Sequence, residues 1–270
     1  LRAQTGVVFL TYRADRRIDA LVEAETKNAP LYDFTAPDGV RHTVWRVVSP
    51  GELARAFEPV SHAYVADGHH RSASAWRAGK ELRTKNTRHH GDEEYNWFLA
   101  VLFPTAQLRI LPYNRVVRDL NGLTPDELLE RLRGVGRLQP ASSPEPDRAG
   151  VFGIYLAGRW HQLELDPATI DRHDPIASLD VALLQDRVLG PILGIGDPRT
   201  DKRIDFVGGI RGPAELARRV DSGEMAVAFA LFPTSLEQLM AVSDAGQVMP
   251  PKSTWFEPKL RSGLFVHELE

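Results

Sequence analysis

The possible folds of this chain are limited first by the alternation of short apolar runs with turn residues and helical patterns. Residues 6–12 have the composition of a buried strand, and the apolar residues of segment 18–26 recur at helical spacing. Residues 151–156 and 159–165 flank Ala157-Gly158 and are predicted to form a β-hairpin. Further strands or helices are predicted at 63–66, 179–189, 213–220, 226–231 and 235–242, and after Thr124. Hairpins mixed with strand–helix units predict an α+β protein with a mixed sheet.

Three segments set the expected organisation of the chain. Residues 80–94 are almost wholly polar or charged, so we predict a mobile surface loop or a lid there. The apolar run 95–103 is predicted as a central strand, with 108–117 as its neighbour. Residues 139–150 are rich in Pro, Ser and Ala and are predicted to be a linker or long loop between regions 1–138 and 151–270.

Composition excludes several classes of protein. The formal net charge of −3, from 33 Lys and Arg against 36 Asp and Glu, attracts neither nucleic acid nor an anionic membrane. No apolar run approaches the roughly 20 residues that span a bilayer. The chain has no cysteine, which excludes disulfides, zinc–thiolate sites and a thiol nucleophile. We expect a cytoplasmic protein without nucleic-acid or membrane partners, of unspecified oligomeric state. Because it starts without Met and enters an apolar run at once, we also expect a fragment of a longer polypeptide.

The strongest chemical signal is a strand that leads through Gly68 directly into an Ala-rich helix. The start of a helix leaves backbone N–H groups without partners and concentrates positive partial charge, and a glycine lets the backbone approach a ligand. Arg71 adds a permanently charged fork that matches phosphate oxygens, and Ser72 adds a hydroxyl. His69 and His70 could donate to phosphate oxygens or carry a proton. This junction predicts a site for phosphate or carboxylate.

The alternative interpretation of the junction is helix capping. Asp67 would then be the N-cap, Gly68 a turn residue, and His69 and His70 surface residues without a role. Two histidines beside an arginine at a helix start are not explained by capping alone, so we favour the anion site.

A glycine-rich loop, residues 194–209, interleaves acidic and basic side chains. Asp197, Asp201 and Asp205 could hold a magnesium ion while the basic residues face phosphate. An exposed loop of paired charges explains the same composition equally well.

A third segment, near the C-terminus, follows the rigid pair Pro250-Pro251. Lys252, Ser253 and Thr254 could lie along a ligand and bind phosphate. The alternative is that the segment only packs the aromatic residues that follow it on the core.

Other polar clusters give weaker signals. His89-His90 with residues 92–94 is not predicted to be a metal site, because consecutive histidines in a polar loop do not converge on one ion without support. Thr234-Ser235 with Gln238 is explained as a helix cap. No P-loop and no dinucleotide fingerprint is found.

Five motifs together resemble the domain-of-unknown-function family numbered 1015, over essentially the whole chain. They are Phe9–Tyr12, Ala66–Arg71, Asp92–Asn96, Leu111–Val116 and Met249–Thr254. That family is similar to the ParB/sulfiredoxin-like superfamily, in which a Gly-His-Arg type of motif at a helix start binds nucleotide phosphates, and some relatives are kinases for free L-serine.

This resemblance implies a fold, a site and a chemistry. The fold would be a mixed-sheet ParB/sulfiredoxin-like core with additional α/β elements, so that region 1–138 becomes the phosphate-binding core. Gly68, His69, His70 and Arg71 would hold the phosphates, with Asp67 beside a metal or the acceptor hydroxyl. Members of the family normally carry a further N-terminal region that is absent before Leu1, and in the serine kinases the N-terminal part holds a catalytic carboxylate.

The function expected from these features is phosphate transfer to a small hydroxyl compound such as free L-serine. ATP, ADP or pyrophosphate would be the donor and Mg²⁺ the expected cofactor. The catalytic candidates are Asp67, His69 and His70, and the metal candidates are Asp67, Asp197 and Asp201. A non-enzymatic nucleotide-binding switch of the ParB-like type is the alternative from another class, and a scaffold that binds only an adventitious anion is a third.

Overall fold

The computed structural model describes residues 2–269, which form two compact units. Unit 1 contains the chain up to Leu108 together with the residues from Pro258 onward, and unit 2 contains Arg109–Glu257. The division therefore falls elsewhere than the predicted boundary at 139–150. Strands β9 (Arg137–Pro140) and β10 (Val151–Leu156), on either side of that segment, belong to the same sheet, so the segment is internal to unit 2.

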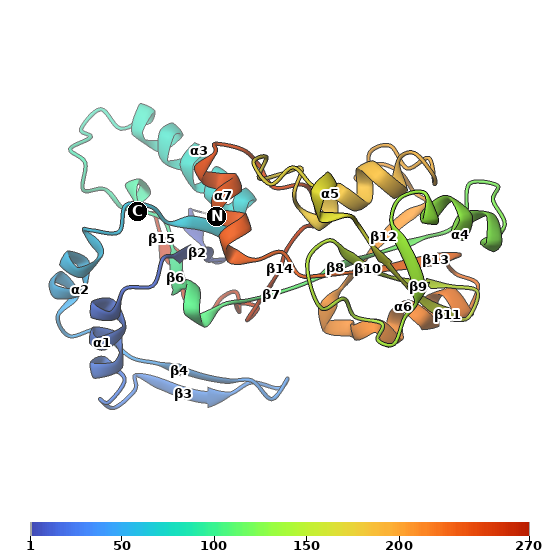
Figure 1. The fold of residues 1–270 in the computed structure, drawn as a ribbon. Helices are drawn as coiled ribbons and strands as arrows, with labels where there is room; N and C mark the ends of the chain where they lie inside the picture. The colour runs from blue at the N-terminus through green and yellow to red at the C-terminus, as the bar shows by residue number, and fades with distance from the viewer. Residues whose placement is uncertain (1, 270) are drawn as a thin grey trace. The chain divides into compact units, whose positions relative to one another are not determined.

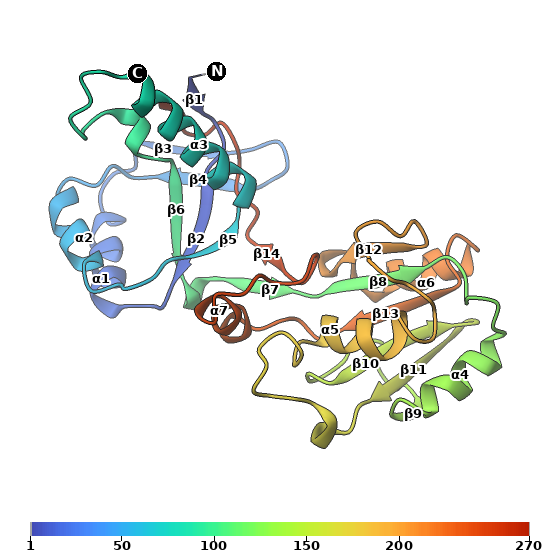
Figure 2. The ribbon, with the colours of Figure 1, turned by 90° about the horizontal axis from the view of Figure 1, so that it is seen from above.

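Unit 1 is built on a three-stranded mixed sheet, in the order β5-β2-β6 (Figure 2). The buried strand β2 (Val8–Tyr12) pairs antiparallel with β5 (Tyr64–Asp67) and parallel with β6 (Ala100–Pro104). The predicted strand at 6–12 is thus confirmed and is the central one. The apolar run 95–103 was wrongly predicted as central, since only its C-terminal part forms a strand and that strand lies at an edge of this sheet.

Residues 108–117 are not the neighbour of that strand. They form β7 (Arg109–Leu111) and β8 (Tyr113–Val117), and both pair with strands of unit 2. The reason is that hydrophobicity predicts that a segment forms a strand but does not predict which strand it pairs with. Here the pairing strands come from far along the chain.

The remaining elements of unit 1 surround its sheet or extend from it. In Figure 1 the hairpin of β3 and β4 extends away from the three-stranded sheet of the same unit. The elements are β1 (Ala3–Gln4), α1 (Arg16–Glu25), β3 (Tyr32–Thr35), β4 (Arg41–Val44), α2 (Pro50–Phe57), α3 (His69–Lys85), η1 (Glu94–Asn96), η2 (Thr105–Gln107) and β15 (His267–Glu268). Strand β1 pairs antiparallel with β15, so both end segments of the chain belong to this unit.

The segment predicted as a mobile loop or lid, 80–94, is more ordered than expected. Helix α3 continues through its first residues and ends at Lys85. In the turns that follow, the Glu93 carboxylate accepts backbone N–H bonds from His90 at 2.8 Å and Gly91 at 2.9 Å. Burial opposes ionisation of this carboxyl, but these bonds dominate and lower its pKa to about 2.

Unit 2 contains a six-stranded antiparallel sheet, in the order β12-β8-β13-β10-β11-β9. The predicted hairpin is confirmed as β10 and β11, joined by Ala157 and Gly158, which both have positive φ. The strands not yet given are β11 (Arg159–Glu164), β12 (Ile204–Gly208), β13 (Val227–Leu231) and β14 (Trp255–Glu257), the last of which pairs with β7.

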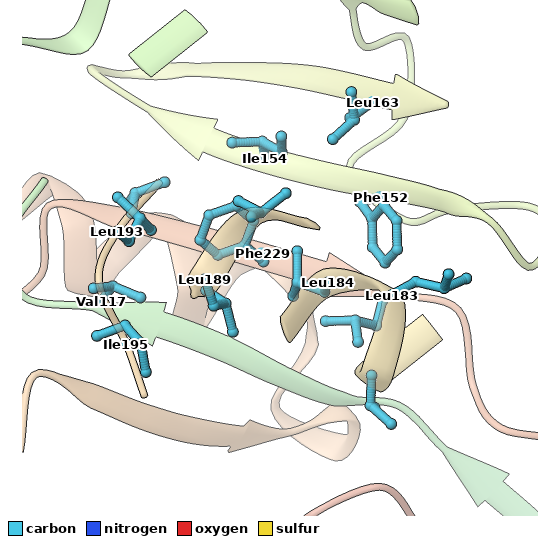
Figure 3. Close-up of a cluster of buried hydrophobic side chains, with 14 of the residues drawn as sticks. Val117, Phe152, Ile154, Leu163, Leu183, Leu184, Leu189, Leu193, Ile195 and Phe229 are labelled. Carbon is cyan, nitrogen blue, oxygen red and sulfur yellow. The ribbon is translucent and has the colours of Figure 1, made fainter. Parts of the chain in front are cut away.

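Each face of this sheet carries a buried cluster. On one face the side chains of β8, β10, β11 and β13 meet Leu184, Leu189 and Leu193, which follow one another along α5 and the turns after it (Figure 3). On the other face Val116, Val207 and Ala228 pack with Leu216 of α6. The helical segments are α4 (Pro125–Arg133), η3 (Pro167–Thr169), α5 (Asp180–Leu184), the π-helical η4 (Gln185–Leu189), η5 (Gly209–Arg211), α6 (Gly212–Asp221) and α7 (Leu236–Asp244).

Two helix starts agree with the sequence in detail. Thr124 and Glu127 form a reciprocal capping box at α4, and Ser235 and Gln238 form another at α7. Across residues 2–269, no helix has the length and apolarity needed to cross a membrane.

Candidate functional site

The strand-to-helix junction forms at the predicted residues, with Gly68 between β5 and α3. Gly68, and not Asp67, occupies the N-cap of α3, with φ 93° and ψ 27°. This left-handed backbone is readily adopted by glycine alone. The Asp67 carboxylate accepts a hydrogen bond from the Gly68 backbone N–H at 2.7 Å and reaches no N–H of the helix itself. The capping interpretation of Asp67 is therefore wrong.

The first turn of α3 lacks the features that ordinarily stabilise a helix start. No side chain caps it and it contains no acidic residue, whereas α4 and α7 have complete capping boxes. Instead the first three residues are His69, His70 and Arg71. Positive side chains are unfavourable beside the positive end of a helix dipole. An anion bound at this position would satisfy both the unpartnered N–H groups and the basic side chains.

Two glycines determine the path of the Arg71 side chain. Its Nε donates to the backbone carbonyl of Val7 at 2.8 Å, and Nη2 lies 4.0 Å from Oδ1 of Asp67. A Cβ added at Gly68 would lie 2.9 Å from Nε and Nη2, and one added at Gly6 would lie 3.0 Å from Cδ. With 43% of its side chain exposed, Arg71 is anchored at Nε while its terminal nitrogens remain accessible.

The other polar residues of the junction differ in how they are held. His69 and His70 are exposed, and neither ring has a hydrogen-bond partner among residues 2–269. Ser72 is half-buried, and its hydroxyl donates to the backbone carbonyl of His69 at 3.0 Å. The hydroxyl oxygen of Ser72 can therefore accept a hydrogen bond from a ligand, but its proton is already donated to the His69 carbonyl.

A groove with a volume of about 390 Å³ adjoins the junction and was not predicted from the sequence. It runs between α3 and the segment that follows Glu94, and Ser72 of the first turn is among its lining residues. The helix contributes Ser72, Ala75, Trp76, Gly79, Lys80 and Arg83, and the facing segment contributes Tyr95, Asn96, Trp97 and Phe98. The helical residues recur at intervals of three and four, so they form one face of α3.

The walls of the groove combine aromatic surfaces with positive charge. Trp76 is 66% exposed and Trp97 61% exposed, although both are large apolar side chains. The Lys80 ammonium lies 5.2 Å from the centroid of the Trp76 ring. Gly79 allows the close approach of the two walls, since a Cβ there would lie 2.6 Å from the Tyr95 carbonyl oxygen.

The segment Lys252–Thr254 belongs to unit 2, and its side chains have different environments there. Ser253 is buried and its hydroxyl donates to the Pro250 carbonyl at 2.6 Å, while its own carbonyl accepts from Thr234 at 3.1 Å. These bonds give Ser253 a structural role. Lys252 is exposed, has a positive φ of 55°, and places its ammonium 5.4 Å from the centroid of the Tyr113 ring.

The acidic residues of loop 194–209 form ion pairs with arginine side chains. Asp197 receives hydrogen bonds from the side chain and backbone of Arg199, which lower its pKa to about 2. Arg203 does the same for Asp201 and likewise lowers its pKa. This geometry matches the interpretation of the loop as paired charges.

In the described part of the chain, residues 2–269, protein side chains alone do not form a magnesium site. Within residues 2–269 no three His, Asp or Glu side chains come together in a way that could hold a metal ion, the histidines at 89 and 90 included. Asp67 keeps an exposed carboxylate, which fits the usual way in which Mg²⁺ binds, through one or two carboxylates together with the phosphates of a substrate.

Comparison with solved structures finds distant likenesses. A mutant free serine kinase in complex with AMP is 13% identical, with a TM-score of 0.41 and coverage of 93% of this chain and 88% of that chain. A mutant free serine kinase in complex with ADP gives 14% identity, a TM-score of 0.40 and coverage of 92% and 83%. A conserved hypothetical protein from Pyrococcus furiosus gives 13% identity, a TM-score of 0.42 and coverage of 94% and 90%. Similarity at this level assigns no ligand or activity to the present chain.

Comparison of sequences is more decisive. No curated protein matches the chain. A family model described as "Protein of unknown function (DUF1015)" matches residues 1–182, a range that contains the whole junction and both walls of the groove. Because the match spans 182 of the 270 residues, the chain belongs to the DUF1015 family.

Proposed function

We propose that this protein binds a nucleoside phosphate at the junction of β5 and α3 and transfers a phosphate group to a small hydroxyl compound such as free L-serine. The observation that carries the proposal is the start of α3. It has glycine at the N-cap, no side-chain cap, and a first turn of two histidines and an arginine. An anion with several oxygens is the ligand that satisfies such a site.

The proposed contacts follow from the geometry. The terminal nitrogens of Arg71 and the backbone N–H groups of the first turn would hold phosphate oxygens, with Gly68 allowing close approach and Ser72 lining the way into the groove. A nucleobase would then lie in the groove against Trp76 or Trp97, since every base has a flat face that stacks on aromatic rings. Lys80 would add a positive charge beside the stacked ring.

The transfer step needs a base and charge neutralisation. The acceptor hydroxyl oxygen would form a bond to the transferred phosphorus while the bond from that phosphorus to the leaving phosphate oxygen breaks. Asp67, His69 or His70 would take the hydroxyl proton, and Arg71 would stabilise the developing negative charge. Asp67 would be the residue that holds Mg²⁺, which would supply neutralising charge for the donor phosphates, and ATP, ADP or pyrophosphate would be the donor.

Further parts of the proposal have separate grounds. A ParB/sulfiredoxin-like core rests on the family resemblance, a cytoplasmic location rests on the composition, and phosphate contacts from Lys252, Ser253 and Thr254 rest on the residue types that follow Pro250-Pro251. Of these three side chains, Lys252 has the geometry best suited to the role, because the Ser253 hydroxyl is already hydrogen-bonded within unit 2.

The test measures binding and turnover in the same variants. The chain is titrated calorimetrically with ADP and ATP in the presence of Mg²⁺, and phosphate transfer to L-serine is then followed. Arg71→Ala is expected to weaken nucleotide binding about tenfold to hundredfold, as for the loss of charge-assisted hydrogen bonds. Arg77→Ala is the matched control. It removes an exposed arginine of the same helix whose side chain, among residues 2–269, is hydrogen-bonded only to Ser74.

The outcomes separate the candidate functions. Product formation that is lost in Arg71→Ala and kept in Arg77→Ala supports the kinase. Nucleotide binding that depends on Arg71 but yields no product would contradict transfer and leave the nucleotide-binding switch. Binding that is unaffected by Arg71→Ala would exclude both.

A further inference from the structure

One wall of the groove, residues 95–98, ends in backbone outside regular structure. Trp97 and Phe98 lie between the short helix η1 and strand β6, and they belong to no helix or strand. Trp97 is 61% exposed and Phe98 46% exposed, so packing of their own side chains does little to hold them. A segment with few buried contacts moves unless other parts of the chain bind its backbone. The position of the wall therefore depends on the groups that hydrogen-bond to it.

The side chain of Gln4 supplies such groups. Its Oε1 accepts a hydrogen bond from the Leu99 backbone N–H at 2.7 Å, and its Nε2 donates a longer bond to the Trp97 backbone carbonyl at 3.4 Å. One donor and one acceptor are also what the backbone of a residue in a neighbouring strand provides. Next along the same segment a strand does so, since the Val8 N–H of β2 donates to the Leu99 carbonyl at 2.9 Å. Gln4 thus extends the support given by β2 into the wall.

The other end of the wall is held by His267. Its Nε2 lies 2.7 Å from a carboxylate oxygen of Glu94, the residue that begins η1 and precedes Tyr95. Only 19% of the His267 side chain is exposed, and its Nδ1 is buried with no hydrogen-bond partner among residues 2–269. With one nitrogen bonded to Glu94 and the other buried, the ring acts on the wall through Glu94 and not by touching a ligand.

Gln4 and His267 are direct partners in one small sheet. They lie opposite each other in the antiparallel pairing of β1 with β15. Residues directly opposite in such a pair place their side chains on the same face. That face is turned toward the wall, because the two side chains bond to Leu99 and Glu94. Two residues from the opposite ends of the chain thus hold the two ends of the same wall.

We infer that Gln4 and His267 are positioning residues for the nucleoside part of the ligand, which they support by fixing Trp97 and Phe98 in the groove. This inference rests on the proposed function, since it takes the groove to be the place of the nucleobase. Stacking on an aromatic ring is stronger where the ring is already held, because ordering a side chain on binding costs free energy. The phosphate end of the site is formed by other residues, so binding of phosphate groups alone does not depend on Gln4 or His267.

The competing explanation is that β1 and β15 only fasten the two end segments of the chain to unit 1. Loss of either side chain would then lower the stability of the unit and affect every ligand of the site alike. A ligand with a nucleoside and a ligand with phosphates alone separate the two explanations.

The experiment measures dissociation constants for ADP and for pyrophosphate, each with Mg²⁺, by calorimetry on the full chain. Gln4→Met keeps a long side chain but removes both hydrogen bonds, and His267→Leu removes the bond to Glu94. Each should raise the dissociation constant for ADP about threefold to tenfold, as for the loss of hydrogen bonds, and that for pyrophosphate by less than about twofold. His267→Gln can present a nitrogen donor to Glu94 and should restore ADP binding.

Two features of the design exclude a general loss of stability. Both ligands are titrated into the same sample, so partial unfolding reduces the number of sites for both and leaves the ratio of their dissociation constants unchanged. Gln107→Met, which replaces an exposed glutamine of unit 1, should match the parent chain. Equal changes for ADP and pyrophosphate, or unchanged ADP binding in Gln4→Met and His267→Leu, would overturn the inference. If one of these variants does not fold, the other decides alone.

The Arg71→Ala variant separates this inference from the proposed function. If it weakens both ligands while Gln4→Met and His267→Leu bind ADP as the parent chain does, the inference is overturned and the proposed function stands. If it leaves both ligands unaffected while the other two variants weaken ADP alone, the proposed phosphate contacts fail and the role of Gln4 and His267 in the groove stands.

Discussion

Replacing Gly68 with alanine would affect the candidate site in two separable ways. The first is the backbone, since φ is 93° and an alanine in left-handed backbone costs about 1–2 kcal/mol. The second is Arg71, because the new Cβ would lie 2.9 Å from Nε and Nη2 of its guanidinium. The side chain would have to move, and its 2.8 Å bond to the Val7 carbonyl would be lost, which adds about 1–3 kcal/mol. We expect Gly68→Ala to lower the free energy of unfolding by roughly 2–5 kcal/mol in total.

Gly39→Ala is the matched control for this prediction. Gly39 also lies in unit 1, has a φ of 82°, and has no atom within 4 Å of an added Cβ. It therefore shares the backbone effect and the effect on the unfolded chain, without displacing an arginine. The assay is urea denaturation followed by circular dichroism, with nucleotide titration of the same samples. Equal losses of stability in the two variants, or unchanged nucleotide binding in Gly68→Ala, would refute the reasoning about Arg71.

Three other predictions concern stability. Burial raises the pKa of Asp180 to about 7, because only one of its oxygens has a partner, the Gly150 N–H. The folded protein therefore holds a proton that the unfolded chain releases. The contribution of Asp180 to the free energy of unfolding should therefore fall by up to roughly 4 kcal/mol from pH 4 to pH 7. Asp180→Asn cannot lose this proton, so urea denaturation of that variant over the same pH range should lack this part of the fall. Thr124→Ala removes one half of the capping box with Glu127 and should cost about 1 kcal/mol in the same assay, and a neutral result would contradict the role of the box. Hydrogen bonds lower the pKa of Glu93 to about 2, so its contribution is present above the unfolded value near 4.5 and is lost as the pH falls through 2. Glu93→Gln should therefore be less stable than the parent chain at pH 7 and similar to it at pH 2, and an equal difference at both values would argue against this.

The features that were predicted correctly from the sequence each depend on residues that are close together in the chain. The capping boxes at Thr124 and Ser235 need only a hydroxyl and a longer polar side chain three residues on. The hairpin of β10 and β11 needs alternating strands and a turn that accepts positive φ. The junction at Gly68 was found for the same reason, because a strand, a glycine and a helix start are contiguous.

The features that the sequence did not predict depend on residues that are far apart in the chain. The run 95–103 was predicted as a core strand from its hydrophobicity, but Trp97 and Phe98 are exposed and face α3 across the groove. Trp76 on α3, with the small residues Ser72 and Gly79 at helical spacing from it, was a signal that could have indicated this face. The pairing of β7 with β14 has no local signature at all.

The chain path has a consequence for synthesis. Unit 2 is one continuous stretch, Arg109–Glu257, whereas unit 1 needs residues from both sides of that stretch, including the pairing of β1 with β15. On a ribosome, unit 2 can be completed while part of unit 1 has yet to be made. We therefore expect β1 to pair with β15 only after unit 2 has been made, whereas β2, β5, β6 and α3, which build the candidate phosphate site, all precede unit 2 and can come together earlier.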